Sequence, residues 1–322
     1  MQTEREKEIA TGVADGEEKS ETRKKRNARK TRKNMFVYAM LLIPVLHFCL
    51  FYIYVNFSSF LLAFRRLDAD GNYFFTLENF RQVFDSFRDD GGMIRQAITN
   101  SLKFFAWNSF VILPLSLFFS FFFYKNIKGK AFFRFMFFVP SIISGVAVAT
   151  TYKMMLSNDG PAGLFYKVVF HAESSPPFFT TAEYAMKSIL FFMFLTGFST
   201  NILLLGGAMS RIPDEAVEAA LLDGANMPTE LFKITLPMIW PTLSTIIVTT
   251  AASILSSSGP ILLLTGGAGN TYDISYYIYD KVQIQGQYGV PAALGLVLTA
   301  ITFPVVMLTR ALVNRIYSDV EF

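Results

Sequence analysis

Six long stretches of the 322-residue sequence contain no Asp, Glu, Lys or Arg, and only 17% of all residues are charged. A soluble domain carries about a quarter charged residues, spread along its length. Each stretch is long enough for a helix across a bilayer, which needs about 20 apolar residues, and backbone in lipid must form its hydrogen bonds internally. The sequence therefore excludes a soluble domain and predicts an all-α polytopic membrane protein. We place its six transmembrane helices at approximately 35–57, 101–124, 133–155, 186–208, 238–259 and 290–313.

Residues for metal, redox and nucleotide chemistry are also scarce. The single cysteine, Cys49, excludes a disulfide within the chain, and the two histidines, His47 and His171, lie in different segments, so we expect no metal site. The sequence contains neither G-x-x-x-x-G-K-[ST] nor a G-x-G-x-x-G motif after a strand. The charge-free stretches hold no carboxylate of the kind that proton- and ion-coupled carriers use. We therefore expect no enzyme activity and no cofactor in this chain, and an energy source in another subunit.

The first 34 residues differ from the rest of the chain. They are polar, lack the apolar region of a signal peptide, and hold a basic cluster between Arg23 and Lys33. We expect a disordered basic cytoplasmic tail (1–34) ahead of a transmembrane domain (35–322). Most of the 29 Lys and Arg then lie in segments on the same side as the N-terminus, as the positive-inside rule requires for cytoplasmic N- and C-termini. No aromatic residue is interleaved with the basic cluster, so contact with lipid is favoured over nucleic-acid binding.

The loop 209–237, between the fourth and fifth spans, predicts a helix–turn–helix at the membrane surface. Pro213 suits the start of a helix, acidic residues follow it in the first turn, and Gly224 suits a left-handed turn that ends the helix. Pro228 can open a second short helix that meets the membrane near Pro237. Small residues at Ala219, Ala220 and Ala225 would allow another backbone to approach closely, which is typical of a docking element.

The spacing in this loop resembles the EAA loop of ABC-importer permeases. The pattern is Glu218-Ala219-Ala220, then Gly224, then Ile234 and Leu236-Pro237. In that family the loop is a coupling helix that inserts into a groove on the cytoplasmic ATPase and carries its motion to the pore. The resemblance implies this role for Glu218, Ala219, Ala220, Asp223, Gly224, Ala225, Ile234, Leu236 and Pro237.

Further segments resemble carbohydrate-type permeases of the maltose and glycerol-phosphate kind, first-subunit type. They are Phe75 to Phe80, Asn100-Ser101, Lys128 to Pro140, and Thr265-Gly266-Gly267, where Ala268 replaces a usual Pro. The resemblance implies a type I ABC-importer architecture in a bacterial inner membrane. It also implies a second permease subunit, two cytoplasmic ATPase copies that bind ATP and Mg²⁺, and an extracytoplasmic solute-binding protein that delivers a sugar or oligosaccharide.

The solute contacts are the least specific prediction. Ser256-Ser257-Ser258-Gly259 interrupts the apolar fifth span with hydroxyls and a glycine, and Tyr288 precedes the sixth. In the resembled family the sugar-contacting residues lie in the matching part of this span, although the maltose permease has an Asn pair where this chain has Ser. The cluster fits equally well as a seam of small residues packed between helices.

Three other functions remain open at this stage. The solute could be an amino acid, a polyamine or phosphate rather than a sugar. A membrane-embedded enzyme would need polar catalytic groups gathered at a span end, and none converge in the sequence. A channel subunit would leave the spacing of the 209–237 loop unexplained.

Overall fold

The computed structural model describes residues 30–31, 33–67, 72–88, 92–125, 128–255 and 259–316. These residues form helices and one small hairpin, so the predicted all-α polytopic membrane fold is confirmed. The predicted disordered tail, 1–34, lies outside the described residues except at its end, where the first long helix reaches back to Lys33.

The chain divides into two units, one ending at Leu61 and the other beginning at Leu62. From Lys33 onward, the described part of the first unit is an apolar helix that includes a π-helical stretch, η1 (Phe48–Tyr54), and continues as α2 (Val55–Ala63), whose last two residues belong to the second unit. None of the residues in its most apolar window is buried. A helix with this composition and length is suited to cross a bilayer with lipid or protein around it.

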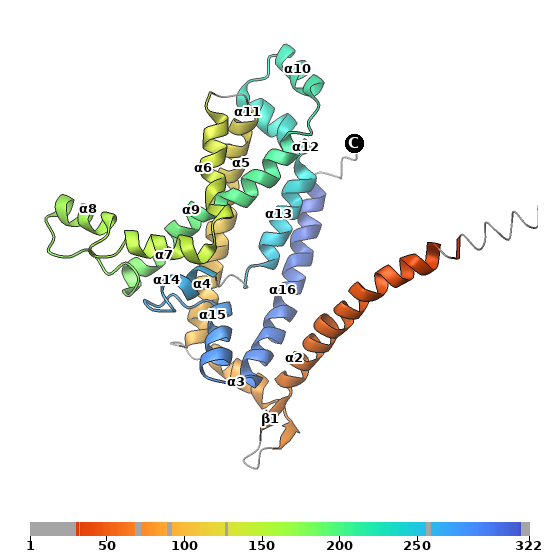
Figure 1. Ribbon diagram of the computed structural model, residues 1–322, viewed down its shortest axis with the longest axis vertical. Helices are drawn as coiled ribbons and strands as arrows, with labels where there is room; N and C mark the ends of the chain where they lie inside the picture. The colour runs from red at the N-terminus through yellow and green to blue at the C-terminus, as the bar shows by residue number, and fades with distance from the viewer. Residues whose placement is uncertain are drawn as a thin grey trace, which may run out of the picture. The chain divides into compact units, whose positions relative to one another are not determined.

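The second unit contains the remaining elements (Figure 1). Its strands are β1 (Arg65–Leu67) and β2 (Tyr73–Phe75), which pair antiparallel with Arg66 opposite Phe74. Its helices before the predicted coupling loop are α3 (Glu78–Arg88), α4 (Met93–Trp107), η2 (Asn108–Ile112), α5 (Leu113–Tyr124), α6 (Lys130–Ile142), α7 (Gly145–Met155), α8 (Pro161–Phe170) and α9 (Ala182–Met209). The helices from that loop onward are α10 (Asp214–Leu222), α11 (Met227–Glu230), η3 (Leu231–Thr235), α12 (Leu236–Met238), α13 (Trp240–Ala252), α14 (Gly259–Leu264), α15 (Ile274–Tyr279), η4 (Asp280–Ile284) and α16 (Gly289–Ile316).

Among the described residues, four helices are long and apolar enough to cross a membrane, or up to six if each of two bent helix pairs counts as one span. The straight ones are Lys33–Ala63, Met93–Tyr124, Ala182–Met209 and Gly289–Ile316. The second of them begins eight residues before the predicted start at residue 101, because its first turns are amphipathic and carry Arg95. An absence of charge therefore marks where a span lies more reliably than where its helix begins.

The third predicted span, 133–155, is wrong as a single helix. α6 and α7 meet at 103°, and the break falls at Ile143 and Ser144, whose backbone is extended. Pro140 inside α6 has no N–H to donate to the preceding turn, which weakens the helix just before the break. Hydropathy measures length and composition, and it does not detect such a bend.

The fifth predicted span, 238–259, is also broken. The helical segment begins at Met227 and bends by 76° at Ile239, between two prolines at 237 and 241. α13 then ends at Ala252, before the predicted end at residue 259. The apolar stretch 234–272 is thus divided among α12, α13, α14 and a loop.

Among the described residues, the buried core of the second unit comprises four clusters, and two of them lie at its ends. At one end Leu205, Met209, Ile239 and Trp240 pack together beneath α10 and α11. At the other, Ala63, Val83, Ile274 and Leu294 pack beneath α3 and the hairpin. Figure 1 shows α10 and α3 at opposite ends of this unit. The packing thus gives the predicted coupling loop a rigid base.

Candidate functional site

The predicted first helix of the 209–237 loop is α10, and residues near its two ends determine where it starts and stops. Pro213 is the residue just before the helix, and Asp214 and Glu215 occupy the first turn, where the helix dipole favours acids. Gly224 has a φ of +81°, so the predicted left-handed turn is confirmed. The N–H of Ala225 donates to the Ala220 carbonyl at 2.9 Å and that of Gly224 to the Leu221 carbonyl at 3.1 Å. These two bonds form a Schellman motif, which ends the helix sharply.

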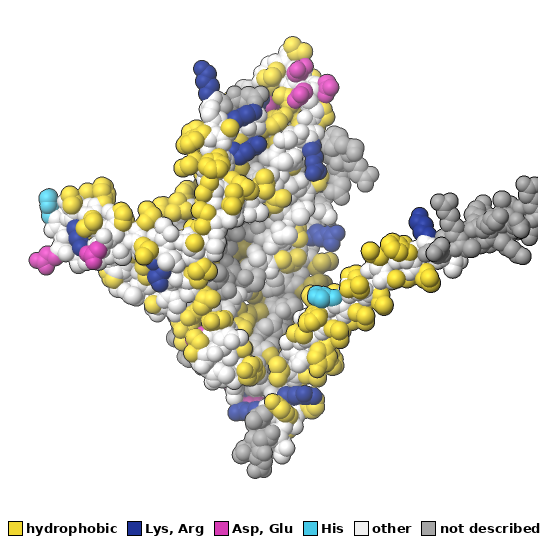
Figure 2. Space-filling model, in the orientation of Figure 1, with side chains coloured by type: hydrophobic (Ala, Val, Ile, Leu, Met, Phe, Trp, Pro, Cys, Tyr) yellow, Lys and Arg dark blue, Asp and Glu magenta, His cyan; other side chains and the backbone are white. Residues whose placement is uncertain are grey.

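α10 lies at the edge of the core, which it contacts through the half-buried Val217. It has no buried residue, and Glu218, Ala219 and Asp223 are exposed. Leu222, at 89% exposure, is a large apolar side chain left almost wholly uncovered at the tip of the molecule. Hydrophobic and acidic side chains share the surface of this tip (Figure 2). A short helix that has no fully buried residue, yet carries apolar side chains outward, is suited to dock on another protein.

The second part of the loop returns to the core. The Asn226 side chain accepts a hydrogen bond from the Thr229 N–H at 3.0 Å and so caps α11, at whose start Pro228 lies as predicted. Ile234, Leu236 and Pro237 are half-buried rather than exposed. Leu236 packs on the cluster of Met209 and Trp240, so these residues anchor the loop, while Glu218 to Ala225 form its free tip.

A buried ion pair ties the base of this loop to the second span. The Glu230 side chain, 2% exposed, contacts the ammonium group of Lys125, which follows the last residue of α5. The other Glu230 carboxylate oxygen, Oε1, is buried without a hydrogen-bond partner among the described residues, as is the hydroxyl of Thr235. A buried carboxylate depends strongly on its only cation. The sequence does not reveal this pair, because Lys125 and Glu230 both lie in charged segments between the predicted spans.

The opposite end of the molecule is held by asparagine side chains in the segments that resembled carbohydrate permeases. Asn79 is 4% exposed and donates to the carbonyls of Ala63 at 2.9 Å and Arg65 at 3.0 Å. It lies so close to Gly289 that a Cβ on that glycine would be 2.7 Å from its Nδ2. Asn79 therefore links residues 63–65 of the second unit to the start of α16.

Asn100 holds the loop that follows α14 by hydrogen bonds to its backbone. Its Nδ2 donates to the carbonyls of Asn270 and Tyr272, each at 2.8 Å. The turn that it holds includes Gly267, whose φ is +81° and whose Cβ position lies 2.5 Å from the Tyr272 ring, so only glycine fits there. The resemblance to carbohydrate-type permeases included Asn100 and Gly267, but their roles in holding this loop follow only from the contacts in the structure.

Asp273 caps α15 in the same loop. Its Oδ1 accepts the Tyr276 N–H at 2.8 Å, while its Oδ2 is buried without a partner among the described residues. Burial raises the pKa of this carboxyl to about 6, although the bond from the Tyr276 N–H opposes the rise. This loop therefore contains a carboxyl group that titrates near neutral pH.

The predicted solute contacts are only partly visible. Ser256, Ser257 and Ser258 lie outside the described residues, and Gly259 is the first residue of α14. Tyr288 is 54% exposed and directly precedes α16. Only Gly259 and Tyr288 of these five residues are described, so the solute site stays a prediction.

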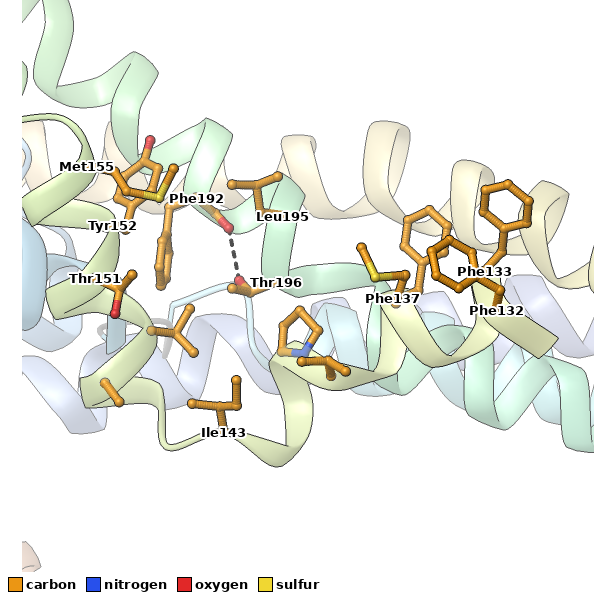
Figure 3. Close-up of a pocket in the computed structure, with 15 residues that line it drawn as sticks. Phe132, Phe133, Phe137, Ile143, Thr151, Tyr152, Met155, Phe192, Leu195 and Thr196 are labelled. Carbon is orange, nitrogen blue, oxygen red and sulfur yellow. Dashed lines mark hydrogen bonds between the residues drawn. The ribbon is translucent and has the colours of Figure 1, made fainter. Parts of the chain in front are cut away.

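Two other regions lie outside the predicted solute contacts and have a hollow or a group of polar side chains. A hollow of about 560 Å³ lies where α6, α7 and α9 meet (Figure 3), and its lining is almost wholly apolar. The hydroxyls of Tyr152 and Thr196 in its lining already donate to the carbonyls of Ser188 and Phe192, at 2.9 Å each. It therefore offers few hydrogen bonds to a sugar.

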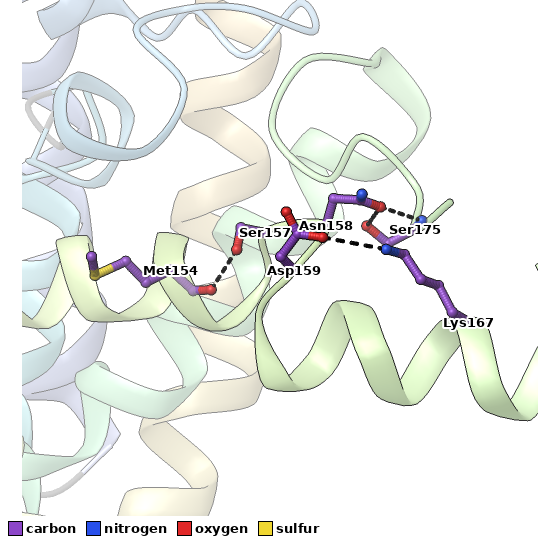
Figure 4. A network of polar contacts seen from close by, with 6 residues as sticks. All are labelled: Met154, Ser157, Asn158, Asp159, Lys167 and Ser175. Atoms are coloured by element: carbon purple, nitrogen blue, oxygen red, sulfur yellow. Dashed lines mark hydrogen bonds and ion pairs between the residues drawn. The ribbon is translucent and has the colours of Figure 1, made fainter. Parts of the chain in front are cut away.

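The second region is the loop around α8 (Figure 4), which satisfies its polar groups internally. Asn158 accepts the Ser175 N–H at 3.0 Å, and Asp159 pairs with Lys167 at 3.5 Å. Neither region gathers catalytic groups, and within the described residues no cluster of His, Cys, Asp and Glu could hold a metal ion.

Comparison with known proteins agrees with this geometry. Residues 112–320 match the family model described as "Binding-protein-dependent transport system inner membrane component". The chain is 26% identical over 296 residues to the probable ABC transporter permease YesP of Bacillus subtilis, covering 87% of this chain and 90% of YesP. It is 31% identical over 176 residues to the multiple sugar-binding transport system permease MsmF of Streptococcus mutans, covering 54% of this chain and 60% of MsmF, less than two thirds of that relative.

The fold has a solved counterpart. A bacterial ABC transporter involved in the import of the acidic polysaccharide alginate contains a chain that superposes with a TM-score of 0.78 at 20% identity. The match covers 90% of this chain and 99% of that one. Because the family model matches well over half of the sequence and the fold agrees, this chain belongs to the family of inner-membrane components of binding-protein-dependent transport systems.

Proposed function

We propose that the chain is a pore-forming permease subunit of an ATP-driven importer for a sugar or oligosaccharide. The single observation that supports this most strongly is α10, a capped helix with no buried residue, in the loop between α9 and the bent α11–α13 segment. The names of relatives favour the solute class: besides MsmF, they include a galactooligosaccharide permease and an arabinooligosaccharide permease of Bacillus subtilis.

The proposed mechanism is alternating access driven from outside the chain. The transporter contains two copies of a cytoplasmic ATPase, which bind ATP and Mg²⁺. A groove on one copy receives α10 of this chain, which contacts it through Glu218, Ala219, Ala220, Asp223, Gly224 and Ala225. ATP binding and hydrolysis move α10, and its half-buried anchors Ile234, Leu236 and Pro237 pass the displacement to α13. Only an interaction that differs between inward- and outward-facing states can shift their balance, and the ATPase dimer supplies that difference.

The remaining assignments follow from this scheme. The N- and C-termini and α10 face the cytoplasm, and the hairpin and α3 face a solute-binding protein outside the bacterial inner membrane. A second permease subunit, a homologue of this chain, completes the pore. The proposed solute contacts are Ser256, Ser257, Ser258, Gly259 and Tyr288.

A photocrosslinking experiment on the assembled transporter tests the scheme. We expect a photoreactive amino acid in place of Leu222, the most exposed apolar side chain of α10, to crosslink to the ATPase. The matched control is the same replacement at Tyr288, which is exposed near the opposite end and is expected to give no ATPase adduct. An ATPase that copurifies yet crosslinks from position 288 and not from 222 would show that α10 is not the docking element.

A further inference from the structure

A second hollow, of about 480 Å³, lies between α6 and α9 on the side of the molecule near α10. Lys130 and Arg134 of α6 and Ser210 after α9 lie at its outer end, and aromatic and aliphatic side chains such as Phe138 and Leu203 line the rest. In Figure 2, basic side chains lie on an otherwise hydrophobic surface near α6. The hollow thus has a charged end and an apolar body.

The depth of the hollow comes from two adjacent glycines on α9. A Cβ on Gly207 would meet no atom within 4 Å, and one on Gly206 would meet only the Arg134 guanidinium at 3.6 Å. The floor is therefore bare helix backbone with the guanidinium above it. Larger side chains at these two positions would fill the space between the helices.

The electrostatics of the hollow favour an anion. Lys130 and Arg134 are separated by one helical turn, and both side chains are exposed. Among the residues that the structure describes, none that lines the hollow is acidic, and no carboxylate forms an ion pair with Arg134. The hydroxyl of Ser210 already donates to the Gly206 carbonyl at 2.8 Å, so anion binding would depend on the two cationic side chains.

We propose that this hollow binds one anionic phospholipid, with the phosphate between Lys130 and Arg134 and an acyl chain along Phe138 and Leu203. Its shape and chemistry match those of a lipid, because the hollow is lined by two cationic side chains of α6 together with apolar side chains of α6 and α9. Basic pockets between transmembrane helices are known to take anionic headgroups.

The bound lipid would connect two parts of the transport mechanism. α6 precedes the bend at Ile143, and α9 leads directly into the loop that carries α10. A phospholipid that contacts both helices would hold them together near the base of that loop. Anionic lipid would therefore regulate transport from a position outside the solute pathway.

Native mass spectrometry of the complete transporter in detergent, titrated with phosphatidylglycerol or phosphatidylcholine, tests the proposal. We expect phosphatidylglycerol to bind at least tenfold more tightly, and the Lys130→Gln/Arg134→Gln variant to lose at least tenfold of that affinity, since each cation near a membrane surface contributes several-fold. Arg310→Gln is the matched control: it removes one exposed charge near the end of α16, away from the hollow, and should bind normally.

A steric variant separates lipid binding from charge loss. Gly207→Leu keeps both cations but fills the open floor, so it should weaken phosphatidylglycerol binding while the subunits remain assembled. Equal binding of the two lipids, or unchanged binding by both variants, would overturn the proposal. Displacement of the lipid by inorganic phosphate would identify a free anion as the ligand. Loss of the second permease subunit from the Gly207→Leu variant would identify the hollow as an interface between subunits. Either result would also contradict the lipid assignment.

Discussion

Gly224→Val is expected to abolish transport while leaving the transmembrane helices folded. Gly224 has a φ of +81°, where an L-residue costs about 1–2 kcal/mol and a β-branched one more. Leaving that conformation also breaks the two hydrogen bonds that end α10, made by the N–H groups of Gly224 and Ala225, each with a net contribution of about 1 kcal/mol. A loss of roughly 2–3 kcal/mol is enough to disorder a helix of nine residues, which is marginal in isolation.

The steric surroundings show that the cost in the isolated chain comes from the backbone. No atom lies within 4 Å of the position where a Cβ would stand on Gly224, and α10 has no buried residue. The rest of the protein therefore has no reason to unfold. The matched control is Gly224→Asn, because Asn tolerates the left-handed region.

The assay compares solute uptake, basal ATPase activity and the yield of assembled complex for wild type and both variants in membranes. We expect Gly224→Val to assemble but not transport, and Gly224→Asn to keep much of the uptake. Failure of both would place the cost in the contact with the ATPase rather than in the backbone. Glu218→Ala, which leaves the backbone unchanged, should have a milder effect. Wild-type uptake by Gly224→Val would refute the assignment of α10 as the coupling element.

Three further predictions concern other residues. Lys125→Met should destabilise the protein by about 3–5 kcal/mol, since it leaves Glu230 buried without a cation. Adding Glu230→Gln should restore much of the lost stability, as measured by thermal unfolding, and no recovery in the double variant would contradict the pairing. Burial raises the pKa of Asp273 to about 6, so its contribution to the free energy of unfolding is fully present below about pH 4 and is lost as pH rises through 6. The loss amounts to up to about 3 kcal/mol, because the buried carboxyl must then ionise. Asp273→Asn, which keeps the oxygen that caps α15, should therefore raise the melting temperature at pH 7.5 more than at pH 5, and an equal effect at both would contradict this reasoning. Ser257→Leu should impair uptake without loss of assembly, whereas normal affinity and rate would return the serine cluster to a packing role.

The sequence alone was sufficient for the features that depend on local chemistry. Stretches without charge located the spans, because a buried ion in lipid is costly wherever it lies. Pro213, the acidic first turn and Gly224 predicted both ends of α10, because helix ends are set by residues within a turn of them. The same spacing predicted a helix at the surface, and residues 214–222 form a helix with no buried residue.

Tertiary structure decided the features that depend on distant partners. The bends at Ile143 and Ile239 lie within continuously apolar sequence, so hydropathy could not separate them from straight spans. The Lys125–Glu230 pair joins residues far apart in the chain, and only folding brings them into contact and buries Glu230. A charge in a loop has the same appearance in the sequence whether water or protein surrounds it; the packing of α11 against the end of α5 determines which of the two it meets.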